Sequence, residues 1–559
     1  MTDATTIYLL LPEIVLIGAA TIIYLAGAFV PRHFMPHAAA VFAILLAGLV
    51  LLGQDLHAHA ELLASAPRAW ISGPLAIDLL GQICLWGILL FALLLVMLSA
   101  NSPSVRPAAE YVGSLLLLVA GLMIVAVAYD LVLLFVGLEL ISIPTYILLY
   151  LGRRDPYGQE ATTKYFFLSI LSSALLLYGF SFLYGAAGTT RLDGLLHVLQ
   201  IAPSGAHVGP GVALAPIAVL LVFAGLGFRM TCVPLHFYAP DVYQGTSNAN
   251  AGLLSTLPKI AGLLVLVRIV YASMPGLETL GWKVAMVMAV ATMTLGNLVA
   301  LWQSDVRRLL AYSSIAHGGY ILIGVATGLG YYDIVARHQN LHLPAPEVPL
   351  QGIGASFFYL AVYCLSTIGA FAALKYLGGR DKQVDSLDEL GGLGRSRPLP
   401  ALALAVSMFS LAGIPPLAGF WGKLTLFSTA LGVDSAPTAG DTAPLRPWFV
   451  GLAVVGVINA AIAMAYYLRV VGVMYFRSGP EGKSSPVKAE GGAGAWWAMI
   501  ACTLLVLGVG VYPGPLITLT NRAAEAIRVA QPVDEDRPDM GQAVDQTHTP
   551  PPNRVSLQK

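Results

Sequence analysis

Long apolar runs separated by short polar segments recur from one end of the chain to the other. Runs of 17 to 25 residues match the roughly 20 residues that an α-helix needs to cross a bilayer. Because backbone polar groups in lipid must be hydrogen-bonded within the protein, such runs predict membrane-spanning helices. Fourteen spans are predicted, at roughly 7–30, 37–53, 75–98, 111–128, 130–151, 161–186, 212–236, 247–270, 279–302, 306–328, 351–377, 399–431, 448–476 and 494–516.

Positive charge is distributed unequally between the two sets of loops that alternate crossings would create. One side collects thirteen cations and the other four, so the positive-inside rule places the first side in the cytoplasm. An even number of spans then puts both termini outside. The thirteen are Arg32, Arg106, Arg153, Arg154, Arg307, Arg308, Arg380, Lys382, Arg395, Arg397, Arg477, Lys483 and Lys488, and the four are Arg68, Arg191, Arg337 and Arg446.

The seventh and twelfth spans share an unusual interruption. The seventh span contains Phe228–Arg229 followed by Pro234. The twelfth contains Gly-Ile-Pro-Pro at 413–416 followed by Gly419. Interrupted helices at corresponding places in two halves indicate inverted repeats with ion sites near the membrane midplane. The offset of five spans is odd, so successive five-helix units would have opposite orientations.

This pattern predicts an all-α polytopic membrane protein with two inverted five-helix repeats. Three helices precede the repeats, one follows them, and a polar tail is expected to be disordered. The predicted units are 1–110 for helices 1 to 3, 111–270 for the first repeat, 279–476 for the second repeat, 494–516 for helix 14 and 530–559 for the tail.

Composition excludes several classes of protein. Residues are 57% hydrophobic and 11% charged, against roughly 25% charged in ordinary soluble domains. The formal net charge is zero, which leaves no basic field for nucleic acid. The segment 55–61 holds two histidines and is interpreted as a solvated loop. The cysteines lack the spacing of metal, haem or iron–sulfur sites, so no cofactor is predicted in this chain; they are Cys84, Cys232, Cys364 and Cys502.

Three ionisable residues lie deep in apolar runs. Glu139 stands in the fifth span, Lys259 in the eighth and Lys423 just after the interruption of the twelfth. A charge at the bilayer centre costs about 2.5–3.5 kcal/mol on insertion scales, so such residues usually have a function. Amines and carboxylates whose protonation can be tuned by burial and by neighbours are suited to a proton relay.

Three further residues admit two interpretations each. Lys164 either belongs to the relay or extends to the cytoplasmic headgroups. Arg229 either acts in transport or neutralises the carbonyl groups of a broken helix, and His317 is either functional or hydrogen-bonded to a neighbouring backbone. Structural roles are expected for the remaining intramembrane charges, which are Glu13, Asp78, Lys375 and Arg469.

Several stretches resemble the antiporter-like membrane subunits of respiratory complex I, and most closely the subunit N branch of NADH-quinone oxidoreductase. They follow the order of the family from the first span to the twelfth. The stretches are PEIVL at 12–16, ELISIPTYIL at 139–148, TTKYFFLS at 162–169, FRMTCVPLHFYAPDVYQG at 228–245, STLPKIAGLLVLVR at 255–268, GNLVALWQSDVRRLLAYSSIAHGGYILIG at 296–324 and GIPPLAGFWGK at 413–423.

The resemblance implies redox-driven proton translocation across a bacterial cell inner membrane. It makes Glu139 the glutamate that modulates a neighbouring lysine, Lys164 a lysine of the proton-uptake region, Lys259 the central relay lysine and Lys423 the lysine that feeds the exit half. A lysine at 423 favours subunit N over subunit M. NADH, FMN, iron–sulfur clusters and quinone are expected in other subunits, with subunit M, small membrane subunits and the lipid bilayer as partners.

One position departs from the family pattern, because Arg229 stands where the family has a lysine. A guanidinium is not expected to release its proton, so a fixed-charge role is favoured over a proton-loading role. Two other functions stay open: a subunit of a cation/proton antiporter, and a structural subunit whose buried charges only pair with one another. A relative of complex I with a different electron donor would share the same features.

Overall fold

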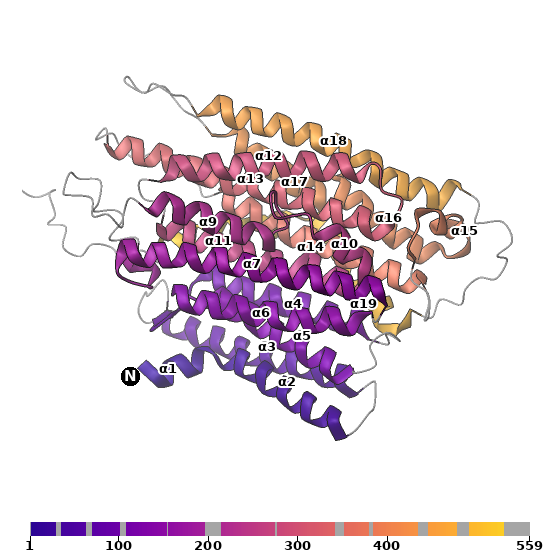
Figure 1. Cartoon of the computed structure of the whole chain (residues 1–559), viewed down its shortest axis with the longest axis horizontal. Coiled ribbons are helices and arrows are strands. Elements are labelled where there is room, and N and C mark those ends of the chain that lie inside the picture. The colour runs from indigo at the N-terminus through magenta and orange to yellow at the C-terminus, as the bar shows by residue number, and fades with distance from the viewer. Residues whose placement is uncertain are drawn as a thin grey trace, which may run out of the picture.

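The computed structural model describes residues 2–29, 35–62, 70–100, 108–153, 155–195, 214–273, 277–340, 351–378, 384–433, 445–477 and 491–529. Within them the chain forms a bundle of long helices that run side by side (Figure 1). Colour in Figure 1 changes gradually across the bundle, so helices that are close in sequence are mostly neighbours. The predicted tail at 530–559 lies outside the described residues.

The N-terminal region consists of four helices and one small hairpin. Strands β1 and β2 pair antiparallel, with Trp70 opposite Ile77. Asp78 then caps the next helix by accepting a hydrogen bond of 2.7 Å from the Gly81 N–H and pairs with the buried Arg268 at 3.0 Å. The elements are α1 (Thr2–Leu9), α2 (Leu11–Phe29), α3 (Met35–Leu62), β1 (Trp70–Ser72), β2 (Leu75–Ile77) and α4 (Leu79–Ser99).

The two predicted repeats are occupied by long helices and by two pairs of shorter ones. The first region contains α5 (Ala108–Val127), α6 (Leu131–Gly152), α7 (Pro156–Ala187), α9 (Ala215–Arg229), α10 (Ala239–Gly245) and α11 (Asn248–Ser273). The second contains α12 (Glu278–Ala300), α13 (Val306–Asn340), α14 (Gln351–Gly378), η3 (Leu387–Leu390), α15 (Leu393–Ser396), α16 (Pro398–Ala412), α17 (Ala418–Leu431) and α18 (Arg446–Phe476). The chain ends in α19 (Gly492–Val511) and α20 (Gly514–Val529).

Each predicted span corresponds to one long helix or to two consecutive shorter ones. Twelve helices of the described residues are long and apolar enough to cross a membrane. The other two predicted spans are the interrupted ones, α9 with α10 and α16 with α17. The expected fold class is therefore confirmed, with interruptions in the seventh and twelfth spans.

Two local expectations were wrong. The segment 55–61 is not a loop, because α3 continues to Leu62; Asp55 accepts hydrogen bonds from Gln82 at 2.6 Å and from Trp86 at 2.8 Å, which hold this end of α3 against α4. The last predicted span also ends early, since α19 stops at Val511 and a separate helix, α20, follows. Pro513 cannot donate a backbone hydrogen bond to continue α19.

The core of the bundle is formed by three helices from different parts of the chain. Apolar windows of α11, α13 and α14 are buried over 94% or more of their length, whereas those of α2, α7 and α18 are about one-third buried. Helices α11 and α13 both pack on α14. Residues on these three helices are therefore shielded by protein on all sides, including any polar ones.

Candidate functional site

The two interrupted spans place helix ends inside the bundle. The segment 230–238 follows α9, and 413–417 follows α16. The last carbonyl groups of a helix lack intrahelical partners and carry the negative end of the helix dipole. Each interruption therefore offers hydrogen-bond acceptors to a cation within the membrane-spanning part of the bundle.

Lys259 occupies the first of these positions. Its side chain comes from α11 and is completely buried. The amine donates to the Met230 carbonyl oxygen at 2.6 Å and also to the Thr231 hydroxyl. Thr231 has a φ of +58°, a left-handed conformation that is unfavourable for a β-branched residue. The backbone strain of the break thus lies directly at the amine.

Lys423 occupies the corresponding position in the second interruption. It belongs to α17, is 5% exposed, and donates to the Ala412 carbonyl oxygen at 2.8 Å. The turn between the half-helices begins at Gly413 with a φ of +88°, which a glycine adopts without strain. The amine also lies over the Tyr320 ring, 5.1 Å from its centroid, a favourable cation–π distance.

His317 of α13 lies between the two lysines, surrounded by tyrosines. Its Nδ1 is 2.5 Å from the Tyr359 hydroxyl and its Nε2 is 3.0 Å from the Tyr467 hydroxyl. The ring centroid is 4.8 Å from that of Tyr363, and Lys259 Nζ is 6.0 Å from the centroid of the same tyrosine. The ring centroid of Tyr320, the tyrosine that Lys423 contacts, is 5.9 Å from that of His317. Each lysine therefore lies against an aromatic ring of this cluster, whose hydroxyl groups can both donate and accept hydrogen bonds.

Glu139 and Arg229 form an ion pair beside the first interruption. Arg229 Nη2 is 3.6 Å from Glu139 Oε1, and the arginine side chain is 3% exposed while the glutamate is 28% exposed. Arg229 also donates to the Ser142 hydroxyl at 3.0 Å, and Glu139 accepts from Ser173 at 2.5 Å. Arg229 immediately precedes Met230, so the ion pair adjoins the carbonyl that binds Lys259.

Lys164 lies in a different ionic cluster. Its amine is 2.6 Å from both Asp241 and Glu160, and its side chain is 39% exposed. It precedes Ser173, the partner of Glu139, by nine residues of the same helix, about 13 Å of rise. Arg308 of α13 holds the other carboxylate oxygen of Asp241 at 2.7 Å. Lys164 is therefore the most exposed of the six predicted residues, and its ion pairs lie with Glu160 and Asp241 rather than with any of the other five.

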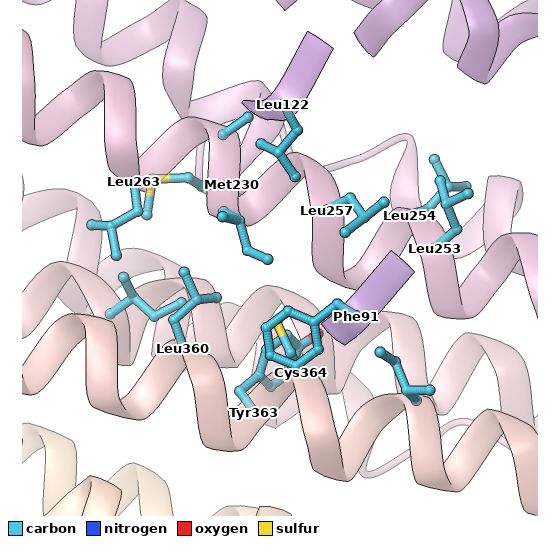
Figure 2. Close-up of a cluster of buried hydrophobic side chains, with 14 of the residues drawn as sticks. Phe91, Leu122, Met230, Leu253, Leu254, Leu257, Leu263, Leu360, Tyr363 and Cys364 are labelled. Atoms are coloured by element: carbon cyan, nitrogen blue, oxygen red, sulfur yellow. The ribbon is translucent and has the colours of Figure 1, made fainter. Parts of the chain in front are cut away.

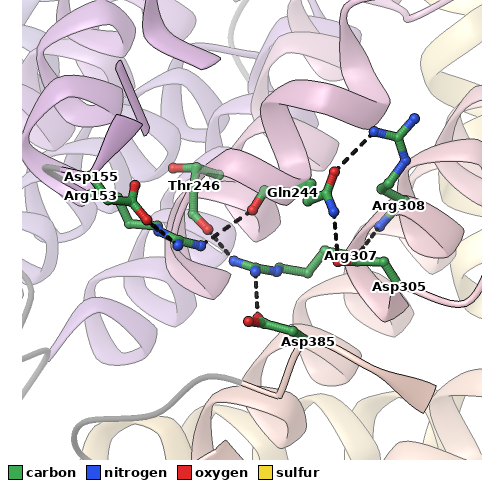
Figure 3. A network of polar contacts seen from close by, with 8 residues as sticks. All are labelled: Arg153, Asp155, Gln244, Thr246, Asp305, Arg307, Arg308 and Asp385. Carbon is green, nitrogen blue, oxygen red and sulfur yellow. Dashed lines mark hydrogen bonds and ion pairs between the residues drawn. The ribbon is translucent and has the colours of Figure 1, made fainter. Parts of the chain in front are cut away.

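Charged loops that were predicted on one side of the membrane meet beside this cluster (Figure 3). Arg307 is 1% exposed and donates to the Thr246 carbonyl and to Asp385, both at 2.5 Å. Partial burial of Asp155 acts to raise its pKa, but hydrogen bonds from Arg153 and from the Gly158 N–H prevail and hold that pKa below its ordinary value of 3.8. Asp155 is therefore ionised at neutral pH and pairs with Arg153.

A cluster of buried apolar side chains lies along the part of α11 that carries Lys259. Figure 2 shows Leu257 and Leu263 of α11 in one cluster with Leu360 and Cys364 of α14 and Phe91 of α4. All these residues are buried. Exclusion of water strengthens electrostatic interactions within such a site, so the carbonyl at the helix break and the nearby ring system dominate the environment of the amine.

Sequence reasoning missed several polar members of the site. Tyr359 and Tyr467 carried no signal, because the chain contains 24 tyrosines and their approach to His317 depends on the packing of α13 with α14 and α18. Asp241 stood within a stretch that resembled the family, but its partners come from α7 and α13. Thr231 could not be recognised without the conformation of the break.

The fold and the interrupted helices define a polytopic membrane subunit of the antiporter-like class. A family model described as NADH:quinone oxidoreductase/Mrp antiporter, TM, matches residues 128–343 and 348–438. Similar proteins include NADH-quinone oxidoreductase subunit N of Paramagnetospirillum magneticum, which is 35% identical over 75% of this chain and 78% of its own. Subunit N 1 of Acidiphilium cryptum is 34% identical over 94% of this chain and 99% of its own.

A solved structure of respiratory complex I from Thermus thermophilus with bound aureothin contains a similar chain. It is 30% identical, covers 91% of this chain and 99% of its own, and has a TM-score of 0.68. This chain belongs to the NADH-quinone oxidoreductase subunit N family. It is a multi-pass membrane protein of that family, in agreement with the long apolar helices of the described residues.

Proposed function

We propose that this chain carries protons across a bacterial inner membrane as the subunit N of NADH-quinone oxidoreductase. The observation that supports it best is the repeated arrangement of a buried lysine at a helix interruption. Lys259 donates to Met230 O and Lys423 to Ala412 O, at 2.6 and 2.8 Å. A neutral side chain could donate the same hydrogen bond at lower cost in the membrane. The presence of a buried amine therefore favours a function that uses its charge.

The proposed path runs from the Glu139–Arg229 pair past Lys259 and the tyrosines around His317 to Lys423. Redox chemistry in other subunits changes the Glu139–Arg229 interaction, which alters the electrostatic field at Lys259. A proton then passes from Lys259 through the His317 cluster to Lys423 and leaves on the far side. A shift of one pKa unit corresponds to about 1.4 kcal/mol, so shifts of a few units can drive a charge against about 2.3 kcal/mol per 100 mV.

Arg229 supplies fixed charge in this scheme. Its guanidinium stays protonated at physiological pH, so its contribution is to attract Glu139 and to repel a nearby ammonium. Its distance of 3.6 Å from Glu139 allows the pair to tighten or separate. Lys164 and Asp241, which are partly exposed, mark the proposed proton-uptake side together with Arg308.

The remaining parts of the enzyme are assigned to other chains. NADH, FMN, the iron–sulfur clusters and quinone belong in partner subunits, and subunit M and the small membrane subunits are the proposed neighbours in the membrane. Both termini of this chain are proposed to lie on the periplasmic side.

The test is proton transport by the assembled enzyme in inverted membrane vesicles. Lys259→Met and Lys423→Met are each expected to reduce the protons moved per NADH oxidised, because neither retains an ionisable group. Lys283→Met, at an exposed lysine of α12, is the matched control and should leave that ratio unchanged. Assembly of each variant is checked on a native gel.

Two results would contradict the proposal. Unchanged proton transport in both buried-lysine variants would indicate a structural subunit. Sodium-dependent proton exchange by the isolated complex without NADH would indicate a cation/proton antiporter instead.

A further inference from the structure

An apolar cavity of about 550 Å³ lies between α4, α14, α19 and α20. Its walls include Gly87 and Phe91 of α4, Leu360 of α14, Leu505 of α19 and Leu519 of α20. Aliphatic and aromatic side chains make up nearly all of the lining. Ligand cavities in proteins have volumes of roughly 300–1,000 Å³, so this one has the size of a binding site.

The cavity begins at one membrane surface and extends into the bundle. Lining residues of α4 and α14 come mainly from the first halves of these helices, and those of α19 from its last half. Helix α20 starts within three residues of the end of α19, at the same surface. At its deep end the cavity reaches Ile260, the residue next to Lys259, and it shares Phe91 and Leu360 with the buried apolar cluster of Figure 2.

Helix α20 forms the wall of the cavity at the membrane surface. Leu516, Leu519, Thr520 and Ala523 all line the cavity, and their spacing places them on one face of the helix. Arg522, beside this face, is exposed. An apolar face with a neighbouring exposed cation is typical of helices at a lipid–water interface, where arginine binds phosphate groups.

We infer that this cavity binds a phospholipid, with one acyl chain inside it and the phosphate at Arg522. The lining offers an apolar chain few polar groups to desolvate. The positive charge of Arg522 complements an anionic headgroup.

A bound acyl chain would cover Ile260, the neighbour of the buried Lys259, from the side of the cavity. Without it, the deep end of the cavity next to Ile260 would be open along the flank of the bundle. Hydrocarbon in this place excludes water and ions from the side of the proton path. The lipid therefore acts as part of the insulation of the site, while its binding does not depend on proton transport.

The experiment fills the cavity and counts bound lipid. A Cβ added at Gly87 meets no heavy atom within 4 Å, so Gly87→Trp directs a large side chain into open space. Gly451→Trp is the matched control, because Gly451 of α18 is equally open and does not line the cavity. The assembled complex is washed in detergent, and phospholipid retained by this chain is measured by native mass spectrometry in the absence of NADH.

The wild-type chain and Gly451→Trp are expected to retain one phospholipid, and Gly87→Trp to retain about tenfold less. Arg522→Gln should keep acyl-chain binding but lose the preference for phosphatidylglycerol over phosphatidylcholine. As a readout that needs no variant, phosphatidylglycerol with a photoreactive acyl chain should label peptides of α4, α14 or α20 in the wild type.

The inference is overturned if the wild type retains no phospholipid, if Gly87→Trp retains as much as Gly451→Trp, or if labelling avoids these three helices. Retention of a quinone or of a free fatty acid in place of a phospholipid would also overturn it. None of these results bears on Lys259 or Lys423, so the proposed function is tested separately.

Discussion

Lys423 Nζ donates a hydrogen bond of 2.8 Å to the carbonyl oxygen of Ala412. The acceptor is the last residue of α16 and the donor lies in α17. This hydrogen bond therefore joins the two half-helices of the twelfth span across its interruption. Lys259 binds the end of α9 in the same way, but from the following long helix rather than from the second half of the interrupted one. Both amines therefore depend on close packing at a helix break.

Close approach of the two half-helices makes Gly419 sensitive to substitution. A Cβ at this position would lie 1.7 Å from the Ser410 carbonyl oxygen, so Gly419→Ala must displace α17 from α16. Overpacking of this kind costs typically about 1–3 kcal/mol. We expect a lower thermal unfolding temperature in detergent and loss of proton transport, because Lys423 moves with α17. Gly451→Ala, at an open position, should match the wild type; equal unfolding temperatures for the two variants would contradict the packing argument.

Arg229 is expected to act through its charge. Arg229→Lys keeps a cation near Glu139, whereas Arg229→Ala removes it. We therefore expect Arg229→Lys to retain most of the proton transport measured per NADH and Arg229→Ala to lose most of it. Near-normal transport by both variants would show that the charge is dispensable.

The same ion pair predicts an asymmetry in stability. Glu139→Gln leaves the 3% exposed Arg229 without its countercharge, while Arg229→Ala leaves a carboxylate that is 28% exposed. Removing one partner of a buried pair costs about 3–5 kcal/mol when the remaining charge is buried. Thermal unfolding of the purified complex should thus show the larger loss for Glu139→Gln. The reverse order would mean that Arg229 is stabilised by groups other than Glu139.

We expect proton transport to need both tyrosine hydroxyl groups that contact the His317 ring, one at each ring nitrogen. Tyr359→Phe and Tyr467→Phe each leave one buried ring nitrogen without its hydroxyl partner, at a cost of about 1–3 kcal/mol. Proton transport should fall in both variants, because each removes a group that can donate and accept. Tyr150→Phe, at an exposed tyrosine of α6, is the control. Transport equal to that of the control would exclude these hydroxyl groups from the path.

Acid should weaken one loop at the end of α7. The Arg191 side chain donates to Asp193 at 2.7 and 3.1 Å, and these hydrogen bonds hold the pKa of Asp193 below its ordinary value of 3.8. A carboxyl with a lowered folded-state pKa stabilises the fold above its unfolded pKa and loses that contribution as the pH falls through the folded pKa.

Asp193→Asn should therefore lower stability at pH 7 by about 0.2–1 kcal/mol, as for a partly exposed ion pair, and by less near pH 3. Thermal unfolding in detergent at the two pH values measures the difference. A deficit of the same size at both would show that the carboxylate charge is not involved.

The pattern along the chain was sufficient to locate the membrane-spanning helices and the two interruptions. Hydrocarbon thickness requires apolar runs of a certain length, and Pro234, Pro415 and Pro416 interrupt two of them, so spans and interruptions follow from local chemistry. The burial of Lys259 and Lys423 was also expected from the same pattern, since both stand within apolar runs.

Only the tertiary structure decided the partners of these residues. The pairing of Lys164 with Asp241, the tyrosines at His317 and the cavity beside α20 each join segments that are far apart in sequence. Such contacts arise from how helices pack around one another, and apolar periodicity says which residues can enter lipid but not which helix face meets which. The end of α3 and the separate α20 likewise depend on contacts with α4 and α14, which no local pattern contains.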